Sequence, residues 1–299
     1  MGLRRMLQVA IFPMNWTTRR GTMDLTHDAR VMGILNVTPD SFSDGGAHCG
    51  MGMALEHARR MIREGAELID VGGESTRPGA EAVAVEVEIA RTVPVIRALR
   101  DEWDGLISID TSKAAVAREA IHAGADIVND ESGLLADPAM AEVCAAAGVG
   151  VVVMHMQGCP QTMQESPAYT DVVAEVRAFF EERLDTLTAA GIMAGALCFD
   201  PGIGFGKSLE HNLALLRSLD KISTSDRPIL LGVSRKSFIA RVLGTQDLES
   251  REWPTVAMTA SAREKGVMLH RVHSVRPNVE ALRMVEAILG GRPRLNVEL

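Results

Sequence analysis

The chain has 299 residues, of which 46% are hydrophobic, and it carries a formal net charge of −8. This length and apolar content are enough to bury a full core as one large domain or two small ones, which excludes a disordered chain. The acidic balance argues against a nucleic-acid platform and against binding to an anionic membrane surface.

The first residues differ from the rest, because residues 1–13 combine basic side chains with only a short, interrupted apolar patch. We expect residues 1–13 to form a disordered extension and residues 14–299 to form one domain. No apolar run is long enough to cross a bilayer. The four cysteines show no CxxC spacing, so we expect reduced thiols in a cytoplasmic protein.

From residue 31 onward, short apolar runs alternate with longer segments of helical periodicity. The predicted strands are 31–35, 68–71, 106–109, 126–128, 150–154, 196–199, 228–233 and 267–272. The predicted helices include 53–64, 86–100, 112–123, 138–147, 171–190 and 209–219. Eight alternations with strands rich in Val, Ile and Leu favour an α/β fold, a single closed (β/α)8 TIM barrel. An open doubly wound sheet is the alternative.

The stretch ALCFDPGIGFGK (196–207) is typical of a buried strand that ends in a glycine-rich loop, with Asp200 at the strand tip. A Walker loop would need glycine where Pro201 stands, and a dinucleotide-binding fingerprint would need its third glycine where Lys207 stands. An acidic strand tip beside an aromatic-bearing loop suits a polar heterocycle better than the phosphates of a nucleotide. Taken alone, the Asp before Pro-Gly is equally compatible with a simple turn.

Polar side chains stand at the carboxyl end of every predicted strand. They are Asn36, Asp70, Asp110, Asn129 with Asp130, His155, Asp200, Ser234 with Arg235 and Lys236, and Arg271 with His273. In a (β/α)8 barrel these ends meet at one face, where such enzymes carry their active sites. A full ring of Asp, Asn, Lys, Arg and His therefore predicts an active site.

Seven separated motifs follow one another at these strand ends. They are GILNVTPDSFSDGG (33–46), DVGGESTRPG (70–79), SIDTS (108–112), MHMQG (154–158), DPGIGFGK (200–207), SRK (234–236) and RVH (271–273). Together they resemble the motifs of dihydropteroate synthases, from about residue 16 to the C-terminal helix. The resemblance implies a transferase of folate biosynthesis that condenses 6-hydroxymethyl-7,8-dihydropterin diphosphate with p-aminobenzoate to give 7,8-dihydropteroate and diphosphate. It also implies a homodimer that packs through its outer helices.

For the pterin ring, whose pyrimidinone edge has both donors and acceptors, the resemblance implies binding by Asp110, Asn129, Asp200 and Lys236. For the leaving diphosphate it implies Asn36, Thr76, Arg271 and His273. Asn36 is the implied magnesium ligand, with diphosphate and water oxygens completing the shell as this hard ion prefers. Arg271 and His273 are two residues apart on a strand, so we expect them to face the same way. We expect Asp110, Lys236, Arg271 and His273 to carry the catalysis.

The implied p-aminobenzoate pocket combines two loops with two strand ends, and its residues are Phe42, Thr76, Arg77, Pro78, Phe205, Lys236 and Ser237. Sulfonamides are expected to compete there. The small residues and prolines of 38–46 and 72–79 indicate loops that close over the site. We favour a dissociative reaction, in which diphosphate leaves first and the aromatic amine then captures the pterin methylene cation. The site would act mainly by positioning, ion pairing and exclusion of water.

Two residues depart from the pattern of this family. Ser274 stands where Asp usually follows Arg-Val-His, and Glu131 stands where an apolar residue is common. These two departures are compatible with a small change in hydrogen bonding behind the diphosphate site or with slower turnover. A methyltransferase acting on methyltetrahydrofolate, or a pterin-binding module without activity, would need neither the STRPG segment nor Arg271 and His273, and both are present.

Overall fold

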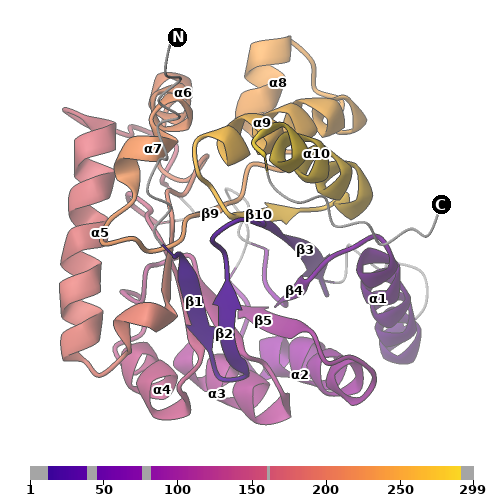
Figure 1. Ribbon diagram of the computed structural model, residues 1–299. Helices are drawn as coiled ribbons and strands as arrows, with labels where there is room; N and C mark the ends of the chain where they lie inside the picture. Colours follow the sequence, from indigo (N-terminus) through magenta and orange to yellow (C-terminus); the bar gives the residue numbers. More distant parts are fainter. Residues whose placement is uncertain (1–12, 39–45, 76–81, 160–161, 291–299) are drawn as a thin grey trace, which may run out of the picture.

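The fold is a ring of parallel strands enclosed by helices, as Figure 1 shows. The computed structural model describes residues 13–38, 46–75, 82–159 and 162–290, with the backbone alone for residues 46–49. Within these residues no helix is long and apolar enough to cross a membrane.

The barrel strands correspond one by one to the predicted apolar runs. They are β3 (Arg30–Asn36), β4 (Leu68–Gly72), β5 (Leu106–Asp110), β6 (Ile127–Asp130), β7 (Gly150–Met154), β8 (Leu197–Asp200), β9 (Leu230–Leu231) and β10 (Leu269–Val272). Their order in the sheet is β8-β7-β6-β5-β4-β3-β10-β9. A parallel bridge between Phe199 and Ile229 brings the two edges of this sheet together. The predicted (β/α)8 barrel is confirmed, and the open doubly wound sheet is wrong because the strands curl into a ring.

Helices surround the strands, and each of the six predicted helical ranges contains helix, although the one predicted over 53–64 begins earlier, at Gly46. The helices are α1 (Gly46–Arg63), α2 (Val85–Glu102), α3 (Ala114–Ala123), α4 (Met140–Ala147), α5 (Val172–Ala189), α6 (Leu209–Arg217), α7 (Leu219–Ile222), α8 (Ser237–Leu243), α9 (Glu252–Glu264) and α10 (Val275–Ile288). The predicted helix 209–219 is in fact two helices, because the backbone of Ser218 between them leaves the helical conformation, with φ −117° and ψ 24°. Gly148 ends α4 with a left-handed φ of 62°, as a glycine cap allows.

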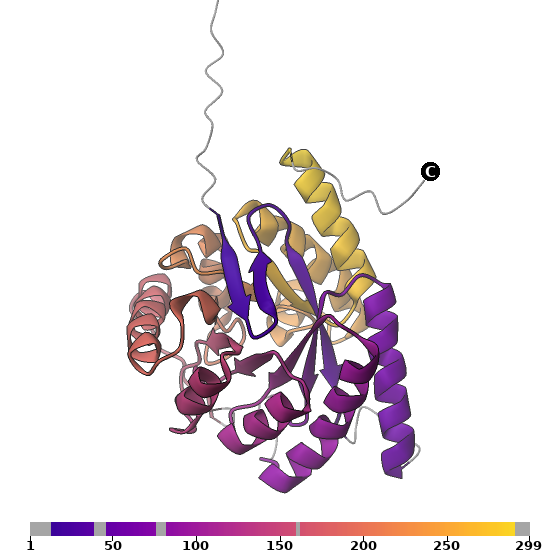
Figure 2. The same cartoon turned by 60° about the horizontal axis from the view of Figure 1, so that its bottom comes forward.

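A β-hairpin precedes the barrel and was not predicted. Its strands are β1 (Asn15–Thr18) and β2 (Gly21–Asp24), and Figures 1 and 2 both show it beside the barrel strands. Trp16 is fully buried and donates its indole N–H to the carbonyl oxygen of Ala196 at 2.8 Å. This hydrogen bond fastens the hairpin to the segment that enters β8. The expected extension at residues 1–13 lies outside the described residues except for residue 13, so the division at residue 14 remains a prediction.

Candidate active site

Three of the predicted site residues lie in one row across neighbouring strands. In the register of the sheet, Asn36 pairs with Gly72, Gly72 with Asp110, and Asp110 with Asn129. Gly72 has no side chain, and a Cβ atom built on it would lie 3.6 Å from both Asn36 Oδ1 and Asp110 Oδ2. The oxygens of Asn36 and Asp110 therefore flank one position at the carboxyl ends of β3 to β5.

Arg271 on β10 is held by two carboxylates from other strands. Its Nε donates to Asp70 Oδ2 at 2.6 Å, and its Nη2 donates to Asp110 Oδ2 at 2.7 Å. Asn129 Nδ2 donates to the same Asp70 oxygen at 3.0 Å. Because Asp70 is fully buried, this network joins four strands in a region of low dielectric, where each hydrogen bond strengthens its neighbours.

Burial and neighbouring charges shift the ionisation of this group. Burial raises the pKa of Asp110 to about 7, against the opposing charge of Arg271 and with added repulsion from Asp70. Burial works against the charge of Arg271, but Asp70 and Asp110 outweigh it and raise the pKa of Arg271 above its ordinary value. Burial, with repulsion from Asp110 and Asp130, raises the pKa of Glu131 to about 8. Perturbed carboxyl groups gathered in this way are typical of functional sites.

A second group of predicted residues meets where β8 ends. The Gly202 N–H donates to Asp200 Oδ1 at 2.7 Å, which folds the loop back over the strand tip. Lys236, which precedes α8, donates from Nζ to the carbonyl oxygen of Ile203. The same Nζ lies 4.5 Å from the centroid of the Phe205 ring, within the range of a cation–π contact.

Asp200 and Lys236 face a common space and affect each other's charge. A Cβ atom built on Gly232 would lie 3.5 Å from Asp200 Oδ2 and 4.0 Å from Lys236 Nζ. Burial raises the pKa of Asp200 against the charge of Lys236. Burial lowers the pKa of Lys236 to about 8, against the charge of Asp200 and with repulsion from Arg271. Lys236 therefore remains a charged donor at neutral pH. Because Arg271 also affects the pKa of Lys236, the group around Arg271 and the group at the end of β8 lie close enough to interact electrostatically.

His273 and Ser274, directly after β10, contact the loop that follows β9. Ser234 Oγ accepts from the His273 backbone N–H at 3.2 Å and lies 2.9 Å from His273 Nδ1. Ser274 Oγ accepts from Arg235 Nη2 at 3.2 Å. The unusual serine at position 274 thus contacts Arg235 and not the carboxylates that hold Arg271.

The remaining predicted residues divide into two sets. Ser237 is the first residue of α8, directly after Lys236. Phe42, Thr76, Arg77 and Pro78 lie outside the described residues. His155, directly after β7, lies at the barrel mouth. Its side chain bonds to Lys207, and its backbone N–H donates to the carbonyl oxygen of Asp200 at 2.9 Å.

The role of Asp70 was missed from the sequence, although its place among the strand ends was noted. Asp70 stands two residues before the end of β4, inside a strand whose residues are all buried. A carboxylate at such a position needs a cationic or hydrogen-bonded partner, since an unpaired buried charge is strongly unfavourable. This pattern was visible in the sequence and predicts a partner, but not that the partner is Arg271.

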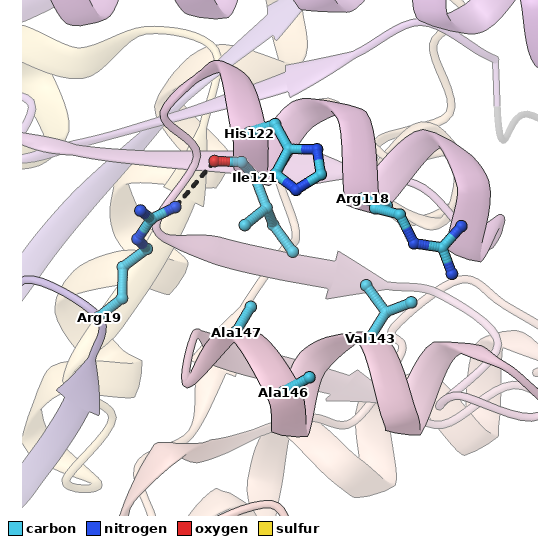
Figure 3. Close-up of a pocket in the computed structure, with 7 residues that line it drawn as sticks. All are labelled: Arg19, Arg118, Ile121, His122, Val143, Ala146 and Ala147. Carbon is cyan, nitrogen blue, oxygen red and sulfur yellow. Dashed lines mark hydrogen bonds between the residues drawn. The ribbon is translucent and has the colours of Figure 1, made fainter.

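A surface hollow of about 450 Å3 lies elsewhere, between α3 and α4 beside the N-terminal hairpin (Figure 3). Its residues are Arg19, Arg118, Ile121, His122, Val143, Ala146 and Ala147. Arg19 Nη1 donates to the carbonyl oxygen of Ile121 at 2.8 Å, as Figure 3 shows, and so satisfies the C-terminal end of α3. The hollow includes none of the predicted site residues and is separate from the candidate active site.

Comparison with known proteins agrees with this geometry. The family described as pterin binding enzyme matches residues 32–273. The chain is 47% identical to the dihydropteroate synthase of Escherichia coli strain K12 over 277 residues, which is 93% of this chain and 97% of the relative. It superposes on the crystal structure of the Yersinia pestis dihydropteroate synthase with a sulfonamide drug, at a TM-score of 0.87 and 46% identity, covering 93% of this chain and 100% of that one. The Burkholderia cenocepacia enzyme complexed with 7,8-dihydropteroate gives a TM-score of 0.84 at 41% identity, with coverage of 93% and 97%.

A barrel whose strand ends gather Asp, Asn, Lys and Arg side chains, and which matches the pterin binding family over most of its length, is a pterin-binding enzyme. Within that class the chain belongs to the dihydropteroate synthase family, the transferases of folate biosynthesis. The resemblance seen in the seven motifs is confirmed, and the methyltransferase and the inactive binding module are not supported.

Proposed function

We propose that this chain joins p-aminobenzoate to 6-hydroxymethyl-7,8-dihydropterin diphosphate, forming 7,8-dihydropteroate and releasing diphosphate. One solved relative, the Xanthomonas albilineans dihydropteroate synthase with 4-aminobenzoic acid, is 42% identical at a TM-score of 0.87. Another, from Burkholderia cenocepacia, is complexed with 7,8-dihydropteroate. The observation in this chain that carries the proposal is the meeting of four polar side chains at the strand ends, Asp110, Asn129, Asp200 and Lys236.

These four side chains match a pterin ring by their hydrogen-bonding capacity. Asp110 and Asp200 offer carboxyl oxygens, Asn129 offers an amide, and Lys236 offers a charged donor. The raised pKa values of both carboxyl groups allow each to donate or accept as the ring requires. In this proposal Asp200 and Lys236 bind one part of the ring, and Asp110 and Asn129 bind another.

The diphosphate is proposed to bind beside this ring, at Asn36, Thr76, Arg271 and His273. Thr76 lies outside the described residues. A magnesium ion fits this place, because Asn36 Oδ1 is a hard oxygen donor that lies beside Gly72, a residue without a side chain. The described residues contain no cluster of three or more His, Cys, Asp or Glu side chains suited to a metal, so most ligands would be diphosphate and water oxygens. When bound, magnesium would neutralise the charge that builds up on the departing diphosphate.

The p-aminobenzoate is proposed to bind over Phe205, Lys236 and Ser237, with Phe42, Thr76, Arg77 and Pro78 from outside the described residues. The Lys236 ammonium above the Phe205 ring presents a positive charge beside an apolar surface. That combination suits an aromatic carboxylate and, equally, a sulfonamide that resembles it.

The reaction is proposed to be dissociative. Arg271 can stabilise the negative charge that develops on the departing diphosphate, because it can exchange its bonds to Asp70 and Asp110 for bonds to the diphosphate. Asp110, released from Arg271, would then face the pterin as positive charge develops on the methylene carbon. That charge would lower the pKa of Asp110 and favour its ionised form, which stabilises the cation electrostatically. The neutral amine attacks without prior deprotonation, so no general base is required before the C–N bond forms.

The assembly and cellular place of the protein are part of the same proposal. Exposed apolar side chains occur on α8, α9 and α10, and they include Val242, Leu243, Trp253, Met284 and Ile288. Figure 1 shows these three helices together on one side of the barrel. A face of this kind suits a homodimer packed through outer helices. Cys144 and Cys198 are buried thiols, as expected of a protein that works in the reducing cytoplasm.

The magnesium site is tested by Asn36→Ala, with Asn15→Ala on the exposed face of the hairpin as a control. We expect Asn36→Ala to raise the magnesium concentration for half-maximal rate about tenfold, because one of few protein oxygens is lost. The KM for p-aminobenzoate should change little. An unchanged magnesium dependence would contradict the proposed role of Asn36.

The dissociative step is tested by exchange of oxygen isotopes within the substrate. If diphosphate departs reversibly before the amine attacks, 18O at the bridging position should exchange with the non-bridging positions in the absence of p-aminobenzoate. Retention of the label, together with a strong dependence of the rate on the basicity of substituted anilines, would show that the amine takes part in C–O cleavage.

A further inference from the structure

Lys207 is a buried lysine that the proposed reaction does not use. It is 2% exposed and lies in the loop that follows β8. Its Nζ lies 3.0 Å from His155 Nδ1, 3.2 Å from the His155 carbonyl oxygen and 3.0 Å from the Phe205 carbonyl oxygen. A lysine ammonium has three N–H donors and no acceptor, so these three acceptors satisfy it completely.

The contact with Lys207 also fixes the state of the His155 ring. In its charged form Lys207 can only donate, so Nδ1 of His155 then accepts and the ring proton lies on Nε2. Burial, with the charge of Lys207, lowers the pKa of His155 to about 3, and the ring is therefore neutral. Phe179 packs edge-on against His155 at a centroid distance of 5.0 Å, which holds the imidazole in this orientation.

Two of the three bonds of Lys207 join the loop after β8 to the loop after β7 at the barrel mouth, and the third, to Phe205, lies within the loop after β8. The loop after β7 begins at His155, and the loop after β8 includes Gly202 to Gly206. A Cβ atom built on Gly202 would lie 1.9 Å from the His155 carbonyl oxygen, and one on Gly206 would lie 2.2 Å from the Gln157 carbonyl oxygen. The two backbones thus touch directly, and Lys207 binds one to the other.

Lys236, which precedes α8, contacts the loop after β8 at Ile203 and Phe205. The carbonyl oxygen of Ile203 accepts from Lys236 Nζ, and the Phe205 ring lies 4.5 Å from it. The carbonyl group of Phe205 is in turn bound by Lys207 at 3.0 Å. A continuous chain of contacts therefore runs from His155 through Lys207 and Phe205 to Lys236.

We propose that Lys207 is a positioning residue that locks the loop after β8 against the loop after β7 and thereby aims Lys236 into the substrate site. Within the part of the chain that the structure describes, Lys207 forms no ion pair with a carboxylate. Burial, with repulsion from Lys236, lowers the pKa of Lys207 to about 7 against the charge of Asp200. Without a carboxylate partner, Lys207 acts through its directed hydrogen bonds to His155 and Phe205. The inference rests on the proposed role of Lys236 in substrate binding.

A double-mutant cycle on the binding of 7,8-dihydropteroate tests this inference. The four proteins are the wild type, Lys207→Met, Lys236→Met and the double variant, and titration calorimetry measures each Kd. We expect Lys207→Met to weaken binding about tenfold when Lys236 is present, since it leaves buried acceptors unsatisfied beside the loop that holds Lys236. In the Lys236→Met background the same change should weaken binding less than about twofold, because the residue it positions is gone. Lys221→Met, at an exposed lysine of α7, is the control and should leave Kd unchanged.

A second pair of variants covers the case in which Lys207→Met fails to fold. His155→Asn keeps an acceptor oxygen close to the place of Nδ1, whereas His155→Leu removes it. We expect His155→Leu to weaken binding as Lys207→Met does and His155→Asn to remain within about threefold of the wild type. Tight binding by His155→Leu, or equal losses from Lys207→Met in both backgrounds, would overturn the inference. Unchanged binding by Lys236→Met would instead contradict the proposed role of Lys236, on which the inference rests.

Discussion

The substitution Asp70→Asn probes the network that holds Arg271. Asp70 is fully buried, and its Oδ2 accepts bonds from Arg271 Nε at 2.6 Å and from Asn129 Nδ2 at 3.0 Å. An amide keeps the shape of the side chain but removes its charge. Breaking a buried ion pair from one side costs about 3–5 kcal/mol. Asp110 remains as a second partner of Arg271, so we expect the lower end, about 3 kcal/mol.

Urea denaturation of Asp70→Asn should therefore show a lower free energy of unfolding, and kcat/KM for the dihydropterin diphosphate should fall at least about tenfold. The fall is expected because a neutral amide oxygen accepts more weakly than the carboxylate from both Arg271 and Asn129. The matched control is Asp104→Asn, whose ion pair with Arg20 is on the surface and whose side chain is 99% exposed. The control should keep the wild-type midpoint. Equal behaviour of the two variants would refute the argument that Asp70 orients the site.

Two further substitutions test other parts of the account. Burial raises the pKa of Glu131 in the folded protein to about 8, so the free energy of unfolding of the wild type falls as pH rises from about 5 to about 8, where this carboxyl group must ionise in the folded state. Glu131→Gln removes the ionisation, and its stability relative to the wild type should therefore increase over this range and level off above about pH 8. Urea midpoints measured from pH 5 to pH 9 would show it, and a constant difference would contradict it. Gly202→Ala should destabilise the protein by about 3 kcal/mol or more, since its φ is +62° and its Cβ would lie 1.9 Å from a carbonyl oxygen. Gly244→Ala, with a φ of +68° and open space around it, should cost about 1 kcal/mol, and similar losses at both positions would refute the steric argument.

Much of this fold was predictable because its signals are local. Each barrel strand is a short run of Val, Ile and Leu, and burial on both faces of a parallel sheet favours such runs. The ends of those strands carry polar residues at the one face where their side chains can meet. The positions of Asp110, Asn129 and Asp200 therefore followed from the strand assignments and the motifs.

What the sequence could not supply were partners that lie far apart along the chain. Arg271 and Asp70 are 201 residues apart, and Trp16 and Ala196 are 180 apart. No local periodicity links such positions, so the carboxylates that hold Arg271 and the docking of the N-terminal hairpin appeared only in the folded structure. The same is true of Lys207, which the motif contained but whose three acceptors come from two different loops.

The most direct test of the central claim is to incubate the purified protein with 6-hydroxymethyl-7,8-dihydropterin diphosphate, magnesium and p-aminobenzoate. Diphosphate release and chromatographic detection of 7,8-dihydropteroate are measured together, in the wild type and in Lys236→Ala and Arg271→Ala. The account predicts equal amounts of both products in the wild type and loss of both in the two variants. Tight pterin binding without formation of 7,8-dihydropteroate would contradict it.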